Sequence, residues 1–391
     1  MKGNWRRWLA AGMAAAVLTA AYPPVHTVRA EDAVPASGAP GVSAASCVLY
    51  EPESGRLLFE KDAHTARSIA STTKLMTALL AAESGDLDRV VTVTKEAVMV
   101  EGSALGLREG DQITIRDLIV GLLLVSGNDA ANVLAIALAG DLPSFAEKMN
   151  ARAQEIGMQD SHFVTPSGLD AEGHAASAYD MALLAAEVLK NEELAAVCAS
   201  KREVVHFGNP PHAVQVSNHN KLLTLYPDAI GMKTGFTKKA GRCLVSAARR
   251  DGVTLIAVTL NAGDDWNDHM ALYDYGFAQT EAVTLPTPEL PELPVAGGRT
   301  VRVHLVCEAP PTAVLFKGEA EQVEVRVELP AFALAPVMQG EQVGEVHYRL
   351  GERELAVLPL TAAYTVDARE VAGYGTRYGR CLRQLLRSLL W

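Results

Sequence analysis

The sequence predicts an α+β fold: an antiparallel sheet with helices on both faces, then a small all-β domain and a C-terminal amphipathic helix. Strand-like segments lie at both ends of residues 42–280, and helical periodicity fills the region between them. A proline-rich break at 281–298 then precedes segments that alternate apolar and polar residues with period two. The predicted divisions are a signal peptide 1–30, a linker 31–41, a main domain 42–280, a β-rich domain 281–372 and the helix 373–391.

The first strands of the main domain are predicted within residues 45–62. The segments SCVLY and RLLFE flank the turn sequence Pro52-Glu53-Ser54-Gly55, which is typical of a strand pair. From Ser71 the pattern becomes helical, because apolar residues recur three and four positions apart. Further helices are predicted over 117–124, 129–138, 144–157 and 179–189.

The main domain returns to strands after Lys233. The segments CLVSAARR and VTLIAVTL are joined by Asp251-Gly252, a dipeptide that strongly favours a hairpin turn. An antiparallel sheet built from the two ends of the domain accounts for this order of elements. The motif around Lys233 is then expected on an edge strand.

Residues 281–391 are predicted to form two further units. VRVHLV, VEVRVEL and GEVHYRL alternate with period two, so each strand is expected to bury one face in a separate β domain. In residues 373–391, leucines at helical spacing alternate with arginines, which suits a helix lying in a membrane surface. The alternative is a helix docked on the protein's own surface.

The N-terminus predicts export. A charged segment with Lys2, Arg6 and Arg7 precedes the apolar run 8–21, and a small-residue cleavage site follows at 28–30. The alternative, a membrane-spanning anchor, needs about 20 apolar residues, and this run is too short. We therefore expect the mature protein at the outer face of the cytoplasmic membrane or in the cell wall, with part of it secreted.

Composition excludes several function classes. The net charge of −11 and the absence of a basic block argue against a nucleic-acid partner. The five cysteines are spread out and odd in number, so small buried thiols are favoured over a disulfide framework. The histidines show no metal-ligand spacing, and we expect neither a metal nor a cofactor.

The first of three short motifs is Ser71-Thr72-Thr73-Lys74. Ser71 and Lys74 are three residues apart on one predicted helix, so their side chains share a face. A serine hydroxyl needs a nearby base to become a nucleophile, and a neutral lysine amine can serve. Burial and a second cation would lower the pKa of Lys74 enough for that role. The alternative for Ser71 is an ordinary N-cap.

The second motif is Ser126-Gly127-Asn128, at a break between two apolar helices. Ser126 can relay a proton, and Asn128 can hydrogen-bond both Lys74 and a substrate amide. A polar interhelical turn is the alternative interpretation.

The third motif is Lys233-Thr234-Gly235, followed by Phe236. Lys233 and Thr234 can hold a carboxylate, and Gly235 lets a substrate backbone approach closely. The N–H of Phe236 can form an oxyanion hole together with the N–H of Ser71. A surface hairpin lysine is the alternative. Each motif alone is a weak signal, but together and in this order they indicate a serine hydrolase.

These motifs resemble those of the D-alanyl-D-alanine carboxypeptidase family, the low-molecular-mass penicillin-binding proteins. The segments RSIASTTKLMTALL, LLLVSGNDAANVLA and GMKTGFTKKAGRCLVSAA carry the resemblance, and HFVTPSGLDAEGHAASAYDMALLA adds to it. The resemblance implies a β-lactamase/transpeptidase-like catalytic domain that is acylated on Ser71 by a peptidoglycan stem peptide ending in D-Ala-D-Ala. It also implies that β-lactam antibiotics acylate the same serine.

The sequence departs from its relatives at several points. The middle motif is S-G-N where others have S-D-N, and no glutamate-bearing loop of β-lactamase type is recognisable around 165–173. Some relatives carry carboxylate-binding arginines near the positions of His219 and Asp268, and neither residue is arginine here. The segments HNKLL and DDWNDH resemble the subfamily of Gram-positive, often spore-forming, bacteria.

A D-Ala-D-Ala carboxypeptidase is the favoured function. Two other functions stay open: a serine β-lactamase on the same fold, and a penicillin-binding scaffold protein whose hydrolysis is incidental. Rapid penicillin turnover would favour the β-lactamase. A Ser71→Ala variant without a cellular phenotype would favour the scaffold.

Overall fold

The computed structural model describes residues 38–369. The predicted signal peptide 1–30 and the predicted helix 373–391 therefore lie outside the described residues. Between 38 and 369, no helix has the length and apolar character needed to cross a bilayer. All four cysteines in this range are free thiols, and three of them are buried.

The first part of the structure is built on a five-stranded antiparallel sheet with the strand order β2-β1-β9-β8-β7. Its strands are β1 (Ser46–Glu51), β2 (Arg56–Lys61), β7 (Ala229–Thr237), β8 (Gly241–Arg250) and β9 (Val253–Ala262). Strand β1 pairs with β9, so strands from both ends of this region share one sheet. The predicted sheet and the edge position of β7 are confirmed.

The hairpin between β8 and β9 is also confirmed. Asp251 and Gly252 have φ angles of 48° and 85°. Two consecutive positive φ values match the right-handed twist of paired strands, as in a type I′ turn. Aspartate and glycine are among the residues that tolerate this conformation best.

Helices occupy the region between the strands, as predicted. They are α1 (Lys74–Glu83), α2 (Lys95–Val98), α3 (Ile115–Leu124), α4 (Asn128–Ala139), α5 (Leu142–Ile156), α6 (Ala178–Lys190), α7 (Glu192–Ala199) and α8 (Leu222–Leu225). Side-chain caps fix several starts: Thr114 accepts from the N–H of Asp117 at α3, and Ser177 accepts from the N–H of Asp180 at α6.

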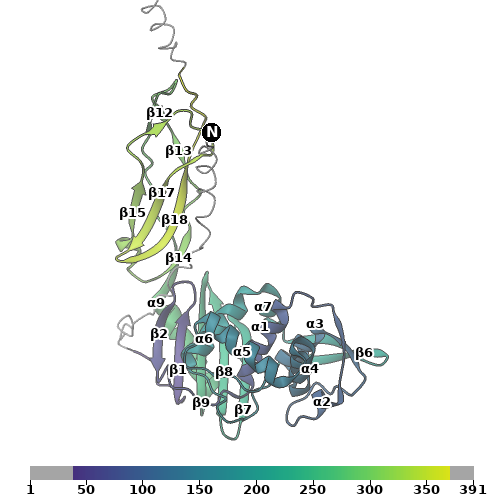
Figure 1. Cartoon of the computed structure of the whole chain (residues 1–391). Coiled ribbons are helices and arrows are strands. Elements are labelled where there is room, and N and C mark those ends of the chain that lie inside the picture. Colours follow the sequence, from purple (N-terminus) through teal and green to yellow (C-terminus); the bar gives the residue numbers. More distant parts are fainter. Residues whose placement is uncertain (1–37, 370–391) are drawn as a thin grey trace, which may run out of the picture. The chain divides into compact units, whose positions relative to one another are not determined.

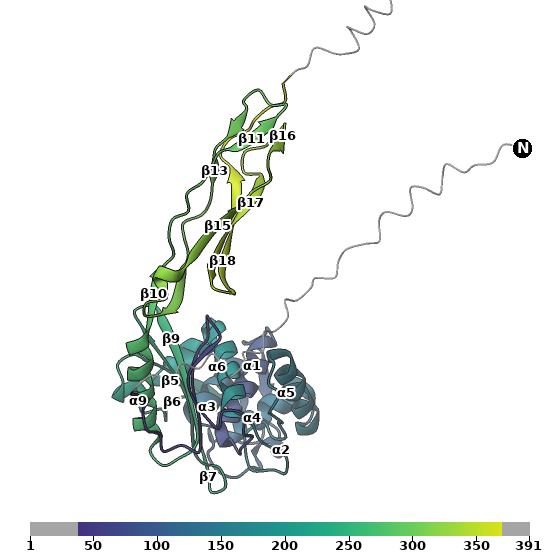
Figure 2. The same cartoon turned by 90° about the vertical axis from the view of Figure 1, so that its left-hand side faces the viewer.

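The sheet buries both faces, and helices cover each of them (Figures 1 and 2). Neighbouring residues of β1 point to opposite sides: Val48 belongs to the core with α1, α3, α4 and α6, while Leu49 packs with α9 (Asp265–Gln279). The sequence did not predict α9. Its first turns mix buried polar residues such as Asp268 and His269 with the apolar ones, which weakens the periodic signal.

A second sheet lies beside the helices, with the order β3-β4-β5-β6. Its strands are β3 (Val90–Thr92), β4 (Gln112–Thr114), β5 (Arg202–Gly208) and β6 (Pro211–Ser217). The hairpin of β5 and β6 was not predicted. β6 has one buried residue, and β5 exposes the apolar Val204, so neither strand shows a clear alternation of buried apolar and exposed polar residues.

From Thr280 the described chain forms three small sheets. They contain β10 (Thr280–Thr284) with β14 (Thr312–Phe316); β12 (Arg302–Val303), β11 (Leu293–Ala296) and β16 (Ala333–Leu334); and β13 (Leu305–Val306), β18 (Arg353–Ala362), β17 (Gln342–Leu350) and β15 (Glu324–Glu328). A 3-10 turn, η3 (Ala320–Gln322), precedes β15. The predicted all-β character is confirmed. VRVHLV, however, is not one strand, because it divides at His304 between two sheets.

Candidate active site

Lys74 is the centre of the site. It is fully buried at the start of α1, and its Nζ lies 2.9 Å from Ser71 Oγ. The same nitrogen donates to Asn128 Oδ1 at 2.7 Å and to the main-chain oxygen of Ser167 at 2.6 Å. Two of the three motifs therefore meet at one amine, together with a carbonyl from a loop 93 residues away.

The sequence analysis placed Ser71 on the same α-helix as Lys74, and this prediction is wrong in detail. It lies in a 3-10 turn, η2 (Ala70–Thr73), that leads into α1. The hydroxyls of Thr72 and Thr73 donate to the carbonyls of Ile69 and Ala70, which satisfies two buried acceptors in this turn. The tighter turn still places Ser71 and Lys74 within hydrogen-bond distance.

The loop after α5 forms one wall of the site. Gly168 has a φ of 81°, and a Cβ there would lie 1.9 Å from the carbonyl oxygen of Ala70. Only glycine allows this approach, which brings the carbonyl of Ser167 to Lys74. His174 supports the loop: its Nδ1 accepts from the N–H of Val164, and its Nε2 lies 2.8 Å from Thr73 Oγ1.

The middle motif lies at the break between α3 and α4. Ser126 is nearly buried and has a positive φ of 62°, which turns the chain before Asn128 begins α4. Asn128 Nδ2 donates to the carbonyl of Glu101 at 2.6 Å, so its oxygen faces Lys74. The buried Asp129 accepts from three successive main-chain N–H groups at 105–107 and fixes the adjoining loop.

The third motif lies on the edge strand β7. A Cβ at Gly235 would meet the main chain of η2, at 3.0 Å from Ile69 O and 3.1 Å from Ser71 N. The strand therefore lies directly against the serine-bearing turn. Lys233 is buried and donates to the carbonyl of Thr234 at 3.0 Å, whereas Phe236 is 66 % exposed.

A cavity of about 420 Å³ joins these elements. Predicted site residues Ser71, Ser126, Thr234, Gly235 and Phe236 line it. Lys74 and Asn128 are buried and hydrogen-bonded to each other beside Ser71, and Lys233 is buried on the same strand as Thr234. The structure therefore brings all eight predicted residues close together.

The electrostatics of the site favour a neutral Lys74. Burial, and then the charge of Lys233, hold the pKa of Lys74 well below its ordinary value of 10.5. Burial also lowers the pKa of Lys233, to about 8. Burial and Lys233 together lower the pKa of His219, which lines the cavity.

Sequence reasoning missed several residues of the cavity. Arg242 on β8 lines it together with Asp265 and Trp266 from α9. Arg242 forms an ion pair with the buried Asp265, and its guanidinium lies 5.6 Å from the centre of the Trp266 ring. The register of β8 against β7 places Arg242 opposite Phe236, a pairing that the sequence analysis did not predict.

His219 and Asp268, the two positions that the sequence analysis compared with arginines, lie in different surroundings. His219 lines the cavity. Asp268 does not, because its carboxylate accepts from the main-chain N–H groups of Ser43 and Ala44. The guanidinium that lines this cavity belongs to Arg242, on the strand β8.

The sequence matches two family models. Residues 33–264 match the D-alanyl-D-alanine carboxypeptidase family, and residues 289–368 match the penicillin-binding protein 5 C-terminal domain. The chain is 30 % identical to D-alanyl-D-alanine carboxypeptidase DacF of Bacillus subtilis, over 82 % of this chain and 85 % of that protein. It is 35 % identical to DacB2 of Mycobacterium tuberculosis, over 61 % of this chain and 84 % of that one.

Solved structures agree with these matches. Penicillin-binding protein 5 of Haemophilus influenzae superposes with a TM-score of 0.65 at 30 % identity, over 84 % of this chain and 98 % of that one. A mutant of the Streptomyces K15 DD-transpeptidase superposes with a TM-score of 0.59 at 32 % identity, over 61 % of this chain and 99 % of that one. This chain therefore belongs to the D-alanyl-D-alanine carboxypeptidase family and is a serine hydrolase of the penicillin-binding fold.

Proposed function

We propose that Ser71 is the nucleophile of this carboxypeptidase and that Lys74 is its general base. The contacts of Lys74 support this proposal. A neutral amine can donate its two hydrogens to the oxygens of Asn128 and Ser167, which leaves its lone pair facing the Ser71 hydroxyl. The depressed pKa of Lys74 favours the neutral form that this arrangement needs.

In the acylation step, Ser71 Oγ attacks the carbonyl carbon of the penultimate D-alanine of a stem peptide, and its proton passes to Lys74. The carbonyl oxygen becomes an oxyanion between the N–H groups of Ser71 and Phe236. The C–N bond then breaks, and Lys74 returns its proton through Ser126 to the nitrogen of the leaving D-alanine. In deacylation, water attacks the ester carbonyl and gives a proton to Lys74; the ester C–O bond then breaks, and Lys74 returns this proton to Ser71 Oγ.

The terminal carboxylate of the stem is expected at Lys233, Thr234 and Arg242. Lys233 supplies a buried positive charge, and Thr234 supplies a hydroxyl inside the cavity. Arg242 is already paired with Asp265, so it offers the substrate only its remaining donors. Because of this pairing, we expect the enzyme to be less selective for substrates with a free terminal carboxylate than it would be with an unpaired arginine.

The nucleophile is tested by intact-mass analysis after penicillin treatment, with peptide mapping of the adduct. One adduct on Ser71, absent from Ser71→Ala, is expected together with D-alanine release from a stem pentapeptide. An adduct on Ser126 would refute the assignment. Rapid penicillin turnover in place of a long-lived adduct would indicate the β-lactamase alternative.

The location of the enzyme is a further part of this proposal. The export signal 1–30 and the basic amphipathic segment 373–391 support an exported enzyme held at the outer face of the cytoplasmic membrane. Both segments lie outside the described residues, so the proposal rests on their sequence pattern.

A further inference from the structure

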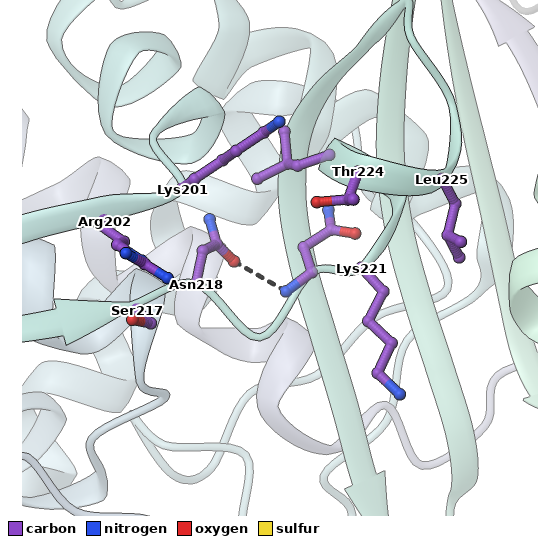
Figure 3. Close-up of a pocket in the computed structure, with 9 residues that line it drawn as sticks. Lys201, Arg202, Ser217, Asn218, Lys221, Thr224 and Leu225 are labelled. Carbon is purple, nitrogen blue, oxygen red and sulfur yellow. Dashed lines mark hydrogen bonds between the residues drawn. The ribbon is translucent and has the colours of Figure 1, made fainter.

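A second hollow lies beside the active-site cavity. Its volume is about 820 Å³, and residues at the start of β5, the end of β6 and around α8 line it. Figure 3 shows Lys201 and Arg202 on the β5 side, with Lys221, Thr224 and Leu225 on the α8 side. None of the predicted catalytic or substrate-binding residues lines this pocket.

The segment 218–221 forms a wall shared by the two cavities. His219 lines the cavity of Ser71, while Asn218, Asn220 and Lys221 line the second pocket. Both asparagines are held in place: Asn218 Nδ2 donates to Ser200 O, and Asn220 Nδ2 donates to Gly231 O, two residues before Lys233. The second pocket therefore adjoins the end of the active site at which the terminal carboxylate is expected.

The charge of this pocket is positive. Lys201, Arg202 and Lys221 are exposed, and within residues 38–369 none of them forms an ion pair. No acidic residue is among those that line the pocket, although the chain as a whole carries a charge of −11. The neighbouring carboxylate of Glu203 accepts from Ser200 Oγ instead.

The three cations lie around the pocket and extend in different directions (Figure 3). Because these side chains do not converge on one point, they suit an extended ligand with several separate negative groups better than one small anion. A peptidoglycan strand is such a ligand. Each uncleaved stem ends in a free D-alanine carboxylate, and stems recur along the polymer.

We infer that this pocket binds the carboxylates of stem peptides next to the one being cleaved, which tethers the enzyme to its polymeric substrate. The inference rests on the proposed function, because it takes the stem terminus as the substrate. Contact at the second pocket would raise the effective concentration of the next stem at Ser71 without a change in the chemistry there.

The experiment compares Lys201→Glu, Arg202→Glu and Lys221→Glu, singly and together, with Lys148→Glu as a matched control. Lys148 is an exposed lysine of α5 whose side chain donates to the main-chain oxygen of Leu138. Sedimentation with insoluble peptidoglycan, freed of phosphate polymers, gives a Kd for each full-length variant in a Ser71→Ala background. The same substitutions on an active Ser71 are assayed for kcat/KM on a soluble pentapeptide.

Each pocket substitution is expected to raise the Kd for the wall about two- to fivefold at low salt. The triple variant is expected to lose most of the salt dependence of binding. Lys148→Glu should bind like the parent, and kcat/KM on the soluble peptide should be unchanged in every variant.

Three results would overturn the inference. Wall binding by the triple variant equal to that of Lys148→Glu would show that the pocket does not hold the wall. A parallel loss of kcat/KM on the soluble peptide would place these residues in catalysis instead. Binding that requires walls with their phosphate polymers would assign the pocket to phosphate. Failure of the proposed function appears separately, as no D-alanine release by the parent enzyme.

Discussion

At the scale of single residues, the proposed mechanism assigns different roles to two buried lysines. The neutral amine of Lys74 can donate to Asn128 Oδ1 and Ser167 O, and its lone pair can then accept from the Ser71 hydroxyl. Lys233 has one main-chain acceptor, Thr234 O, and remains cationic near neutral pH because its pKa is about 8. Burial lowers both pKa values, but only Lys74 carries the additional effect of a neighbouring cation.

Removal of the general base gives the first prediction. Lys74→Ala should slow acylation of Ser71 by penicillin about 10²–10⁴-fold, because positioned bases contribute that much. Stopped-flow acylation rates measure the change. A rate within a few-fold of the parent would assign the base to another group. Lys148→Ala, on the surface of α5, is the control for loss of a lysine elsewhere.

The pH profile gives the second prediction. Lys233 loses its charge as the pH rises through about 8, so KM for the stem peptide should increase above that pH. Lys233→Ala removes a like charge next to Lys74, which favours the ammonium form and raises the pKa of Lys74. The acid limb of the acylation profile should therefore move to higher pH in Lys233→Ala. An unmoved acid limb would mean that the two lysines are not coupled.

At the scale of elements, the site exists because three segments approach at main-chain distance. The turn η2, the edge strand β7 and the loop at 165–168 meet at positions where Gly235 and Gly168 leave no room for a side chain. The sequence predicted the edge strand but placed Ser71 in an α-helix instead of η2, and the role of these glycines is visible only once the segments are packed together.

Enlargement of one of these glycines gives the third prediction. Gly235→Ala places a methyl group 3.0–3.1 Å from main-chain atoms of Ile69, Ser71 and Thr72, so β7 and η2 must separate by several tenths of an ångström. Because both proposed oxyanion donors, the N–H groups of Ser71 and Phe236, lie there, kcat should fall about 10²–10³-fold. Gly263→Ala is the control, since its nearest atoms lie at 3.8 Å. Equal kcat values for the two variants would contradict the proposed oxyanion hole.

The loop with His174 gives the fourth prediction. Burial, and then His162, lower the pKa of His174 to about 4, so the folded protein holds this ring neutral. The unfolded chain binds a proton near pH 6.5. Stability from the neutral ring is therefore complete above about pH 6.5 and falls by up to about 3 kcal/mol as the pH drops to 4.

Thermal unfolding midpoints at pH 7.0, 5.5 and 4.5 measure this effect. His174→Asn should unfold at lower temperature than the parent at pH 7, with a difference that narrows toward pH 4.5. The exposed His206 provides the control variant, His206→Asn. A difference that stays constant with pH would show that protonation of His174 does not affect folding.

At the scale of the whole molecule, the motifs, the cavity and the sheet all lie within the part that matches the carboxypeptidase model or just after it. The C-terminal β part matches a separate family model, the penicillin-binding protein 5 C-terminal domain. The division at 280 and 281, the signal peptide and the membrane helix remain predictions from the sequence.

Removal of the last segment gives the fifth prediction. A chain that ends at Ala372 should leave the membrane fraction and keep its kcat/KM on soluble pentapeptide, because the proposed catalytic residues all precede Gln279. Each basic residue of 373–391 contributes on the order of 1 kcal/mol to anionic membranes, so binding of the full chain should weaken with salt. A truncated chain that unfolds, or still sediments with membranes, would refute the anchor.

Local sequence patterns correctly predicted much of the fold. The periodicity of 117–124 and 179–189 predicted α3 and α6, and Asp251-Gly252 predicted the β8–β9 hairpin, because these signals depend on near neighbours. The helix α9 and the hairpin of β5 and β6 were missed for the same reason. Contacts with distant elements bury the polar residues Asp268 and His269 in α9 and leave the apolar Val204 of β5 exposed, so residue type alone does not identify their buried faces.

By itself, the sequence determined the order and identity of the three motifs, and with them the nucleophile, the base and the carboxylate site that we propose. Only the tertiary structure decided that Lys74 is fully buried, that Ser167 supplies a carbonyl to it, and that Arg242 enters the cavity. The physical reason is the distance along the chain over which each property is determined. Motif chemistry is carried by residue type and spacing, whereas burial, pKa and hydrogen-bond partners depend on segments brought together across the chain.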